Sequence, residues 1–232
     1  MTAPAEASLP GRASQPAGAD CDAAGFVLAG GLSRRMGREK ALIEFGGRPL
    51  IVHALEILLG AGLPASIAGA QANLQAFAPV IHDANPGAGP LAGICAALAA
   101  THAQHVVFIS VDLPFVPPSL VAFLLHHARV TGRAITIATV AGFAQTFPAV
   151  IAREALPALA SELNAGRNGC FAAFEAAAAG LGQAVSRISV ECIAQSGHVF
   201  HPNGMPPAQW FLNLNTPSEM ERAEALRKRR IA

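Results

Sequence analysis

The chain has 232 residues, of which 52% are hydrophobic, and its 16 Lys and Arg nearly balance its 15 Asp and Glu. This length and apolar content are enough for one sizeable hydrophobic core. A net charge of +1 does not indicate a surface for nucleic acid or for an acidic membrane, so we predict no nucleic-acid or membrane partner.

The cysteines and the N-terminus indicate a cellular compartment. Cys21, Cys95, Cys170 and Cys192 are widely spaced, without a CxxC pair, which favours reduced, buried thiols over disulfides or a zinc site. No apolar run reaches membrane-spanning length, and the N-terminus lacks the charged-then-apolar order of a secretory signal. We therefore predict a cytoplasmic protein.

The segments taken in chain order predict an α/β protein. Residues 1–22 are rich in Ala, Pro, Gly and Ser and are predicted to be a disordered leader, followed by a single domain over 23–232. Apolar patterns predict strands over 25–30, 65–69, 79–82, 105–110, 134–140 and 147–152, and helices over 49–62, 89–103, 116–130, 153–166, 167–180 and 217–230. This alternation implies a parallel or mixed sheet covered by helices on both faces.

In such sheets ligands bind beyond the C-terminal ends of the strands, so the segments that follow strands are the candidate sites. The first is "FVLAGGLSRRMGREKAL" (26–42), in which Gly30 and Gly31 allow a tight turn close to a ligand. A hydroxyl and four cations follow, the groups that bind phosphates: Ser33, Arg34, Arg35, Arg38 and Lys40.

The spacing of this loop fits neither GxGxxG nor GxxxxGK[ST], which excludes the dinucleotide fingerprint and the Walker loop. An ordinary turn with solvated charges is the alternative. The concentration of charge in a chain with only two lysines, Lys40 and Lys228, favours phosphate binding.

Two aspartates in the body of the chain also follow strands. Asp112, after "HVVFIS", precedes the predicted helix start at Pro117 or Pro118 by several residues, so capping explains it poorly and magnesium binding beside a phosphate is favoured. Asp83 precedes a loop containing Gly89 and is equally suited to accept N–H groups of a guanine or cytosine base or to start an Asx-turn.

The segment "FLNLNTPSEM" (211–220) combines two asparagines with a helix start. Thr216 and Glu219 have the spacing of a capping box, with proline at the first helical position, so Thr216 is predicted to be structural. Asn213 and Asn215 could contact a metal or phosphates, or could close turns, and the sequence leaves both open.

Four blocks in this order resemble the molybdenum cofactor guanylyltransferases, the MobA-type enzymes: "LAGGLSRRMGREKAL", "GPLAG", "VDLPF" and "NLNTPSEM". The resemblance covers nearly the whole chain after the leader. It implies a Rossmann-like, three-layer nucleotidyltransferase fold with a mostly parallel sheet. It also implies transfer of GMP from GTP to molybdenum-molybdopterin with Mg²⁺ as cofactor and release of pyrophosphate, and it leaves partner proteins that deliver or receive the cofactor possible.

The resemblance also assigns roles. It implies nucleotide contacts from the backbone of Leu28, Ala29 and Gly30, a catalytic Lys40, guanine binding by Asp83 and metal binding by Asp112. Some members of the family bind the nucleotide through an asparagine after the second strand, and the nearest match in this chain is Gln71. In the mechanism that follows, Arg35 and Lys40 offset charge on the triphosphate and on the leaving pyrophosphate, without a covalent intermediate.

Two other functions fit parts of the pattern. A related nucleotidyltransferase could use CTP, as a molybdopterin cytidylyltransferase does, or a sugar 1-phosphate acceptor, but L-A-G-G and "GPLAG" favour guanosine. A non-catalytic nucleotide-binding adaptor has less need of Asp112 and Lys40.

Overall fold

The structure is a computed structural model that describes residues 22–30, 32–33, 38–69, 72–83 and 87–231. The predicted leader therefore lies outside the described residues except for Asp22, and the domain boundary at residue 23 stays a prediction. None of the helices in these ranges has both the length and the apolar character needed to cross a membrane.

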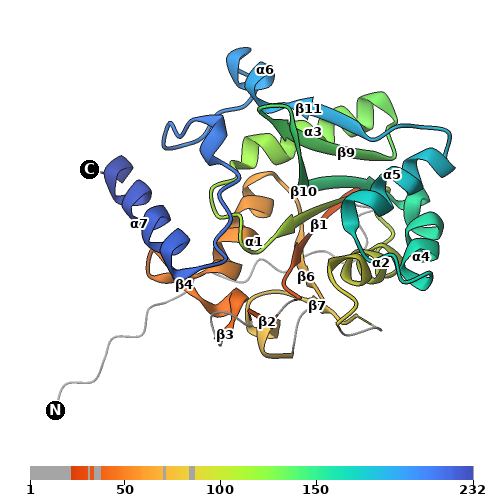
Figure 1. The fold of residues 1–232 in the computed structure, drawn as a ribbon, viewed down its shortest axis with the longest axis horizontal. Helices are drawn as coiled ribbons and strands as arrows, with labels where there is room; N and C mark the ends of the chain where they lie inside the picture. The colour runs from red at the N-terminus through yellow and green to blue at the C-terminus, as the bar shows by residue number, and fades with distance from the viewer. Residues whose placement is uncertain (1–21, 31, 34–37, 70–71, 84–86, 232) are drawn as a thin grey trace.

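A seven-stranded mixed sheet forms the centre of the fold (Figure 1), in the order β11-β9-β10-β8-β1-β6-β7. Two short ribbons, β2-β3 and β4-β5, lie outside it. The strands are β1 (Ala23–Leu28), β2 (Leu32–Ser33), β3 (Arg38–Glu39), β4 (Glu44–Phe45), β5 (Arg48–Pro49), β6 (Ala65–Ala68), β7 (Val80–Ile81), β8 (His105–Ser110), β9 (Ile135–Val140), β10 (Phe143–Ala152) and β11 (Ser186–Ser189).

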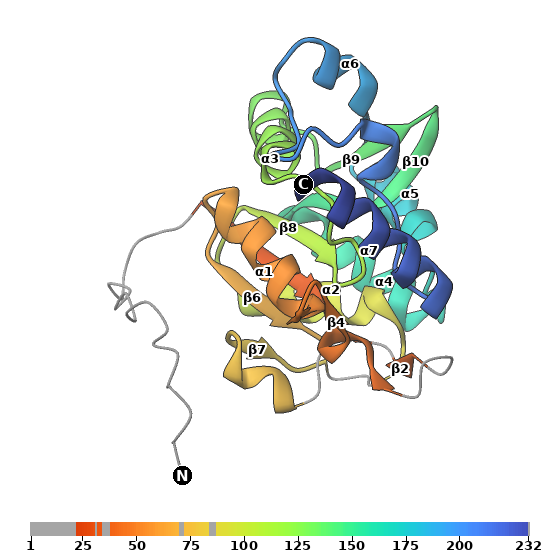
Figure 2. The ribbon, with the colours of Figure 1, turned by 90° about the vertical axis from the view of Figure 1, so that its left-hand side faces the viewer.

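Helices cover both faces of this sheet, as predicted. One core contains side chains of α1 and α3, together with Trp210 and Leu214, and the other contains side chains of α2, α4 and α5. Figures 1 and 2 show these groups on opposite sides of the strands. The helices are α1 (Leu50–Gly60), α2 (Pro90–Ala100), α3 (Pro118–Thr131), α4 (Leu156–Asn164), α5 (Cys170–Gly180), α6 (Val190–Gln195) and α7 (Pro217–Ile231).

The central strands are parallel, and their pairing explains their composition. β1 pairs in parallel with β6 on one side and with β8 on the other, and β6 pairs with β7. Because helices cover both faces, β1 and β8 are buried along nearly their whole length, which is why each is a continuous apolar run. The C-terminal ends of all four strands therefore lie along one edge of the sheet.

One predicted strand is longer than expected. We predicted a strand over 147–152, but β10 begins at Phe143 and pairs antiparallel with both β8 and β9. Ala141 and Gly142, both at positive φ (49° and 80°), form the tight turn that joins β9 to β10. The ribbons, β11 and α6 were not predicted, since their short segments have little periodicity.

The burial of the cysteines differs from the prediction at one position. Cys95 is buried and Cys170 partly buried, and burial raises the pKa of each to about 11, so both are unreactive near neutral pH. Cys192 is exposed on the short helix α6, so the prediction of a buried thiol is wrong there. Cys21 lies outside the described residues.

Candidate functional site

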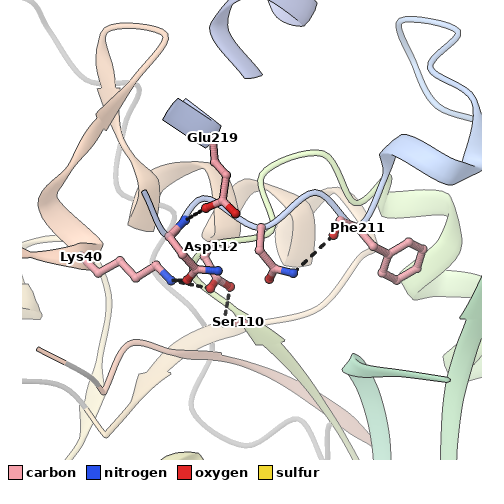
Figure 3. Close-up of polar contacts among 7 residues, drawn as sticks. Lys40, Ser110, Asp112, Phe211 and Glu219 are labelled. Carbon is pink, nitrogen blue, oxygen red and sulfur yellow. Dashed lines mark hydrogen bonds and ion pairs between the residues drawn. The ribbon is translucent and has the colours of Figure 1, made fainter. Parts of the chain in front are cut away.

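The C-terminal edge of the sheet brings together residues from both ends of the sequence. Lys40 begins a 3-10 turn directly after β3, and Asp112 follows β8 by two residues. The Lys40 Nζ lies 2.5 Å from Asp112 Oδ2, and it also donates to Asn215 Oδ1. Figure 3 shows the lysine reaching this carboxylate from the neighbouring segment. Lys40, one of the predicted phosphate-binding cations, and Asp112, the predicted metal ligand, therefore meet in one cluster.

The backbone of Lys40 is fixed by the residues on either side of it. Glu39 accepts a hydrogen bond of 2.5 Å from the side-chain amide of Asn73, and β3 pairs with β2. Ala41 is fully buried, and the N–H of Ile43 donates to the Lys40 carbonyl at 3.2 Å. The Lys40 side chain is 17% exposed, so its ammonium is directed into the cluster rather than into open solvent.

Asp112 is held at both of its side-chain oxygens. Lys40 contacts Oδ2, and the hydroxyl of Ser110, the last residue of β8, donates to Oδ1 at 2.5 Å. Asp112 caps no helix, because α3 starts at Pro118 with Pro117 at its N-cap. Ser110 was not singled out from the sequence, although its place at the end of the strand, two residues before the carboxylate, was a usable signal.

The two asparagines have different surroundings. Asn215 joins the cluster through its side-chain carbonyl, which accepts from Lys40. The amide of Asn213 instead donates to the carbonyl of Phe211 at 3.5 Å, which closes a local turn. The structure thus brings Asn215 to the lysine and the carboxylate, whereas Asn213 follows the alternative that the sequence left open.

The predicted capping box at the start of α7 is confirmed. The N–H of Glu219 donates to the Thr216 hydroxyl at 3.2 Å, and the Glu219 carboxylate accepts from the N–H of Asn215 at 2.8 Å. The hydrogen bond from the Asn215 N–H is the largest cause that holds the pKa of Glu219 below its ordinary value. The positive charge of Lys40 is a smaller cause in the same direction. The cap of α7 is therefore directly attached to the polar cluster.

Five of the other predicted nucleotide contacts lie along the same edge. Leu28 and Ala29 are buried at the end of β1, and Gly30 follows them at the surface. Asp83 follows β7, and Gly89 is the N-cap residue of α2. Ser33 lies in β2, while Gly31, Arg35 and Gln71 lie outside the described residues.

Three glycines explain how the strands and α2 approach so closely here. A Cβ on Gly30 would lie 2.7 Å from the carbonyl oxygen of Gly69, just after β6. A Cβ on Gly93 of α2 would lie 3.5 Å from the Gly69 nitrogen, an ordinary contact. Of these three, Gly30 must lack a side chain because of this close contact, and Gly69 favours glycine because its φ is +71°.

We expect Gly30→Ala to destabilise the protein by about 1–3 kcal/mol, because the Gly69 backbone must move to admit the new methyl group. Nucleotide binding should weaken with it. Gly93→Ala is the matched control: it should be neutral or stabilising, since glycine inside a helix costs about 1 kcal/mol relative to alanine. Thermal denaturation and nucleotide titration of both variants measure this. Equal melting temperatures would contradict the expectation.

A metal ion at this edge would be bound by carboxylate and side-chain amide oxygens together. In the described part of the chain, no three His, Cys, Asp or Glu side chains gather as a metal-binding group. The ammonium of Lys40 nevertheless sits between a carboxylate oxygen and a carbonyl oxygen, those of Asp112 and Asn215. These are the donor types that Mg²⁺ prefers, so the donor set fits a hard divalent cation.

The fold and the site define a class of protein, the α/β nucleotidyltransferases. A solved structure of this class, molybdopterin-guanine dinucleotide biosynthesis protein A from Archaeoglobus fulgidus, is similar with a TM-score of 0.71 at 25% identity, covering 88% of this chain and 98% of that chain. The model of the MobA-like NTP transferase domain matches residues 25–180. The chain belongs to the MobA-like NTP transferase family.

Relatives with assigned names agree with this family. A molybdenum cofactor guanylyltransferase of Rhizobium meliloti (strain 1021) is 33% identical over 213 residues, which cover 86% of this chain and 89% of the relative. Another relative with that name, from Rhizobium johnstonii, is 46% identical over 109 residues, but that match covers only 44% of this chain and 50% of the relative.

Proposed function

We propose that the chain transfers GMP from GTP to molybdenum-molybdopterin and releases pyrophosphate. The observation that supports this most directly is the contact of Lys40 with Asp112 and Asn215 at the C-terminal edge of the sheet. A relative that matches most of the chain is named a molybdenum cofactor guanylyltransferase. This edge is where α/β proteins of this class bind nucleotides.

The strand order indicates which end of the nucleotide would lie near which aspartate. Asp112 follows β8 and Asp83 follows β7, and β1 and β6 lie between these strands. Three steps between neighbouring strands separate β8 from β7 by about 14 Å. The aspartates therefore suit opposite ends of an extended nucleotide, with the triphosphate near Lys40 and Asp112 and the guanine near Asp83.

In the proposed reaction an anionic phosphate oxygen of molybdopterin attacks the α-phosphorus of GTP. A new phosphorus–oxygen bond forms there, and the bond from the α-phosphorus to the bridging oxygen of the β-phosphate breaks. The electron pair leaves with pyrophosphate, whose added negative charge the Lys40 ammonium is placed to offset. Arg35, outside the described residues, stays a predicted second cation.

We further propose that Asp112 and Asn215 bind Mg²⁺ when the nucleotide is present. The ion would neutralise phosphate charge and align the phosphates. Lys40 now holds the oxygens that such an ion would need, and its long, flexible side chain can turn toward the phosphates instead. Ser110 keeps Asp112 oriented in either arrangement, because it contacts the other carboxylate oxygen.

Nucleotide choice is the sharpest test. We expect the protein to use GTP at least about a hundredfold better than CTP or ATP, since a carboxylate that accepts two guanine N–H groups is worth about 1.5–3 kcal/mol per bond. The measurement is pyrophosphate release with Mg²⁺ and molybdenum-loaded molybdopterin, with each nucleotide in turn.

Asp83→Asn provides the internal control for that assay. It should reduce the preference for GTP while the Lys40–Asp112 contact, on other strands, stays intact. Efficient turnover with CTP by the unaltered protein would contradict the proposed donor. Nucleotide binding without any pyrophosphate release would favour a binding-only adaptor.

A further inference from the structure

Asn215 is oriented by two neighbouring backbone hydrogen bonds. The N–H of Leu214, whose side chain is fully buried, donates to the main-chain carbonyl of Asp112 at 3.1 Å. The next N–H, that of Asn215 itself, donates to the Glu219 carboxylate at 2.8 Å. One bond fixes this segment to the loop after β8, and the other fixes it to α7.

The second of these bonds holds the backbone of the residue whose side chain contacts Lys40. Asn215 is exposed, so packing alone does not hold its amide toward Lys40. The Thr216 hydroxyl accepts from the Glu219 N–H, a backbone bond that caps the helix. Figure 3 shows the Glu219 carboxylate directly above the cluster of Lys40, Asp112 and Ser110.

We propose that Glu219 is a positioning residue for the transfer reaction: by accepting the Asn215 N–H, it holds the Asn215 carbonyl against Lys40 and Asp112. This inference rests on the proposed function. Among the hydrogen bonds of the described residues, Glu219 reaches the cluster through Asn215. Its charge also interacts with that of Lys40, so the test separates the effect of this charge from the effect of the hydrogen bond.

Three variants separate positioning from simple helix capping. Glu219→Ala removes the acceptor, whereas Glu219→Gln keeps a carbonyl oxygen that can accept the same N–H. Thr216→Val weakens the helix cap but keeps the carboxylate at residue 219. Glu221→Ala removes a nearby exposed carboxylate of α7 and is the control for surface charge.

We expect Glu219→Ala to lower kcat about tenfold or more with KM for GTP nearly unchanged, because a misplaced group acts mainly on the transition state. Glu219→Gln should recover most of the lost kcat. Thr216→Val should lower the melting temperature at least as much as Glu219→Ala but keep kcat within about threefold of the original. Glu221→Ala should change neither.

A second readout does not depend on turnover. The chain has only two lysines, so NMR of ¹⁵N-labelled lysine gives one Nζ signal for Lys40 and one reference signal for Lys228. Glu219→Ala should shift the Lys40 signal and speed its proton exchange, since the bond to Asn215 loosens, while Lys228 stays unchanged. Glu219→Gln should restore the slow proton exchange of Lys40, because it keeps an acceptor for the Asn215 N–H, while the loss of charge still shifts the signal.

The two readouts distinguish failure of the inference from failure of the proposed function. If Glu219→Ala leaves both the Lys40 signal and kcat as they are, or if Thr216→Val lowers kcat as much as Glu219→Ala does, Glu219 is only a helix cap and the inference is wrong. If the unaltered protein shows no turnover, but Glu219→Ala speeds the proton exchange of Lys40 and Glu219→Gln does not, the proposed function fails while the placement of Asn215 by Glu219 is supported.

Discussion

Asp112→Asn is expected to lower GMP transfer by about a thousandfold while the protein stays folded. The substitution keeps the shape and the main-chain carbonyl that accepts from Leu214, but it removes the negative charge. Without that charge, neither a divalent cation nor the Lys40 ammonium is held as tightly beside the phosphates. Steady-state pyrophosphate release and thermal denaturation measure the two parts of this expectation.

Asp22→Asn is the matched control for that variant. Asp22 also loses an ion pair on substitution, the one with Arg129 at 2.8 Å, but it lies just before β1, at the opposite end of that strand from the site. Its activity should stay close to that of the original protein. A folded Asp112→Asn protein with full activity would exclude Asp112 from the proposed role.

Lys40→Met should lower kcat by about a hundredfold to a thousandfold, because the charge that offsets the leaving pyrophosphate is lost. Methionine keeps the apolar stem of the side chain but leaves the Asp112 carboxylate, which is only 12% exposed, without its cation. Stability should therefore fall by up to about 3–5 kcal/mol, and the melting temperature is measured together with kcat. The second lysine supplies the control, since Lys228→Met removes the same charge from an exposed position on α7.

Lys40→Met should lower activity but strengthen metal binding in the nucleotide-free protein. The Lys40 ammonium occupies the oxygens of Asp112 and Asn215, so Lys40→Met should bind Mn²⁺ more tightly when no nucleotide is present. Titration followed by electron paramagnetic resonance measures this. Weaker Mn²⁺ binding in Lys40→Met would mean that these oxygens are not the metal ligands.

The buried elements were predictable because their sequences are simple. β8 coincides with the predicted strand over 105–110, and α2 starts at Pro90, within the predicted helix. Burial on both faces makes such strands continuous apolar runs, and a proline at the first turn marks a helix start. The edge where Asp83 and Asp112 lie followed from these elements and the rule for parallel sheets.

Other features depend on which distant segments meet, and no local pattern encodes that. The contact between Gly30 and Gly69 arises only from the register of β1 on β6. The hydrogen bond from the Leu214 N–H to the loop after β8 likewise joins segments that are far apart in the sequence. The hydrogen bond from the Asn215 N–H to Glu219 was not predictable either, because the capping-box pattern predicts the contact with Thr216 but not a contact with the residue before it.

The docking of α7 also decides how the site responds to partial unfolding. Besides Glu219, α7 holds Glu224, which accepts from the Gly46 N–H at 2.5 Å, and Arg227, which lies over the Phe45 ring at 6.0 Å. Both contacts reach the ribbon that follows Lys40, and Figures 1 and 2 show α7 beside it.

Asn215, which contacts Lys40 from 175 positions away in the sequence, lies just before this mostly polar helix and hydrogen-bonds with its Glu219, so detachment of the helix would loosen the site. Helices with few buried side chains detach at a smaller free-energy cost than the strands of a sheet. We therefore expect heat or denaturant to inactivate the protein under milder conditions than those that unfold its sheet.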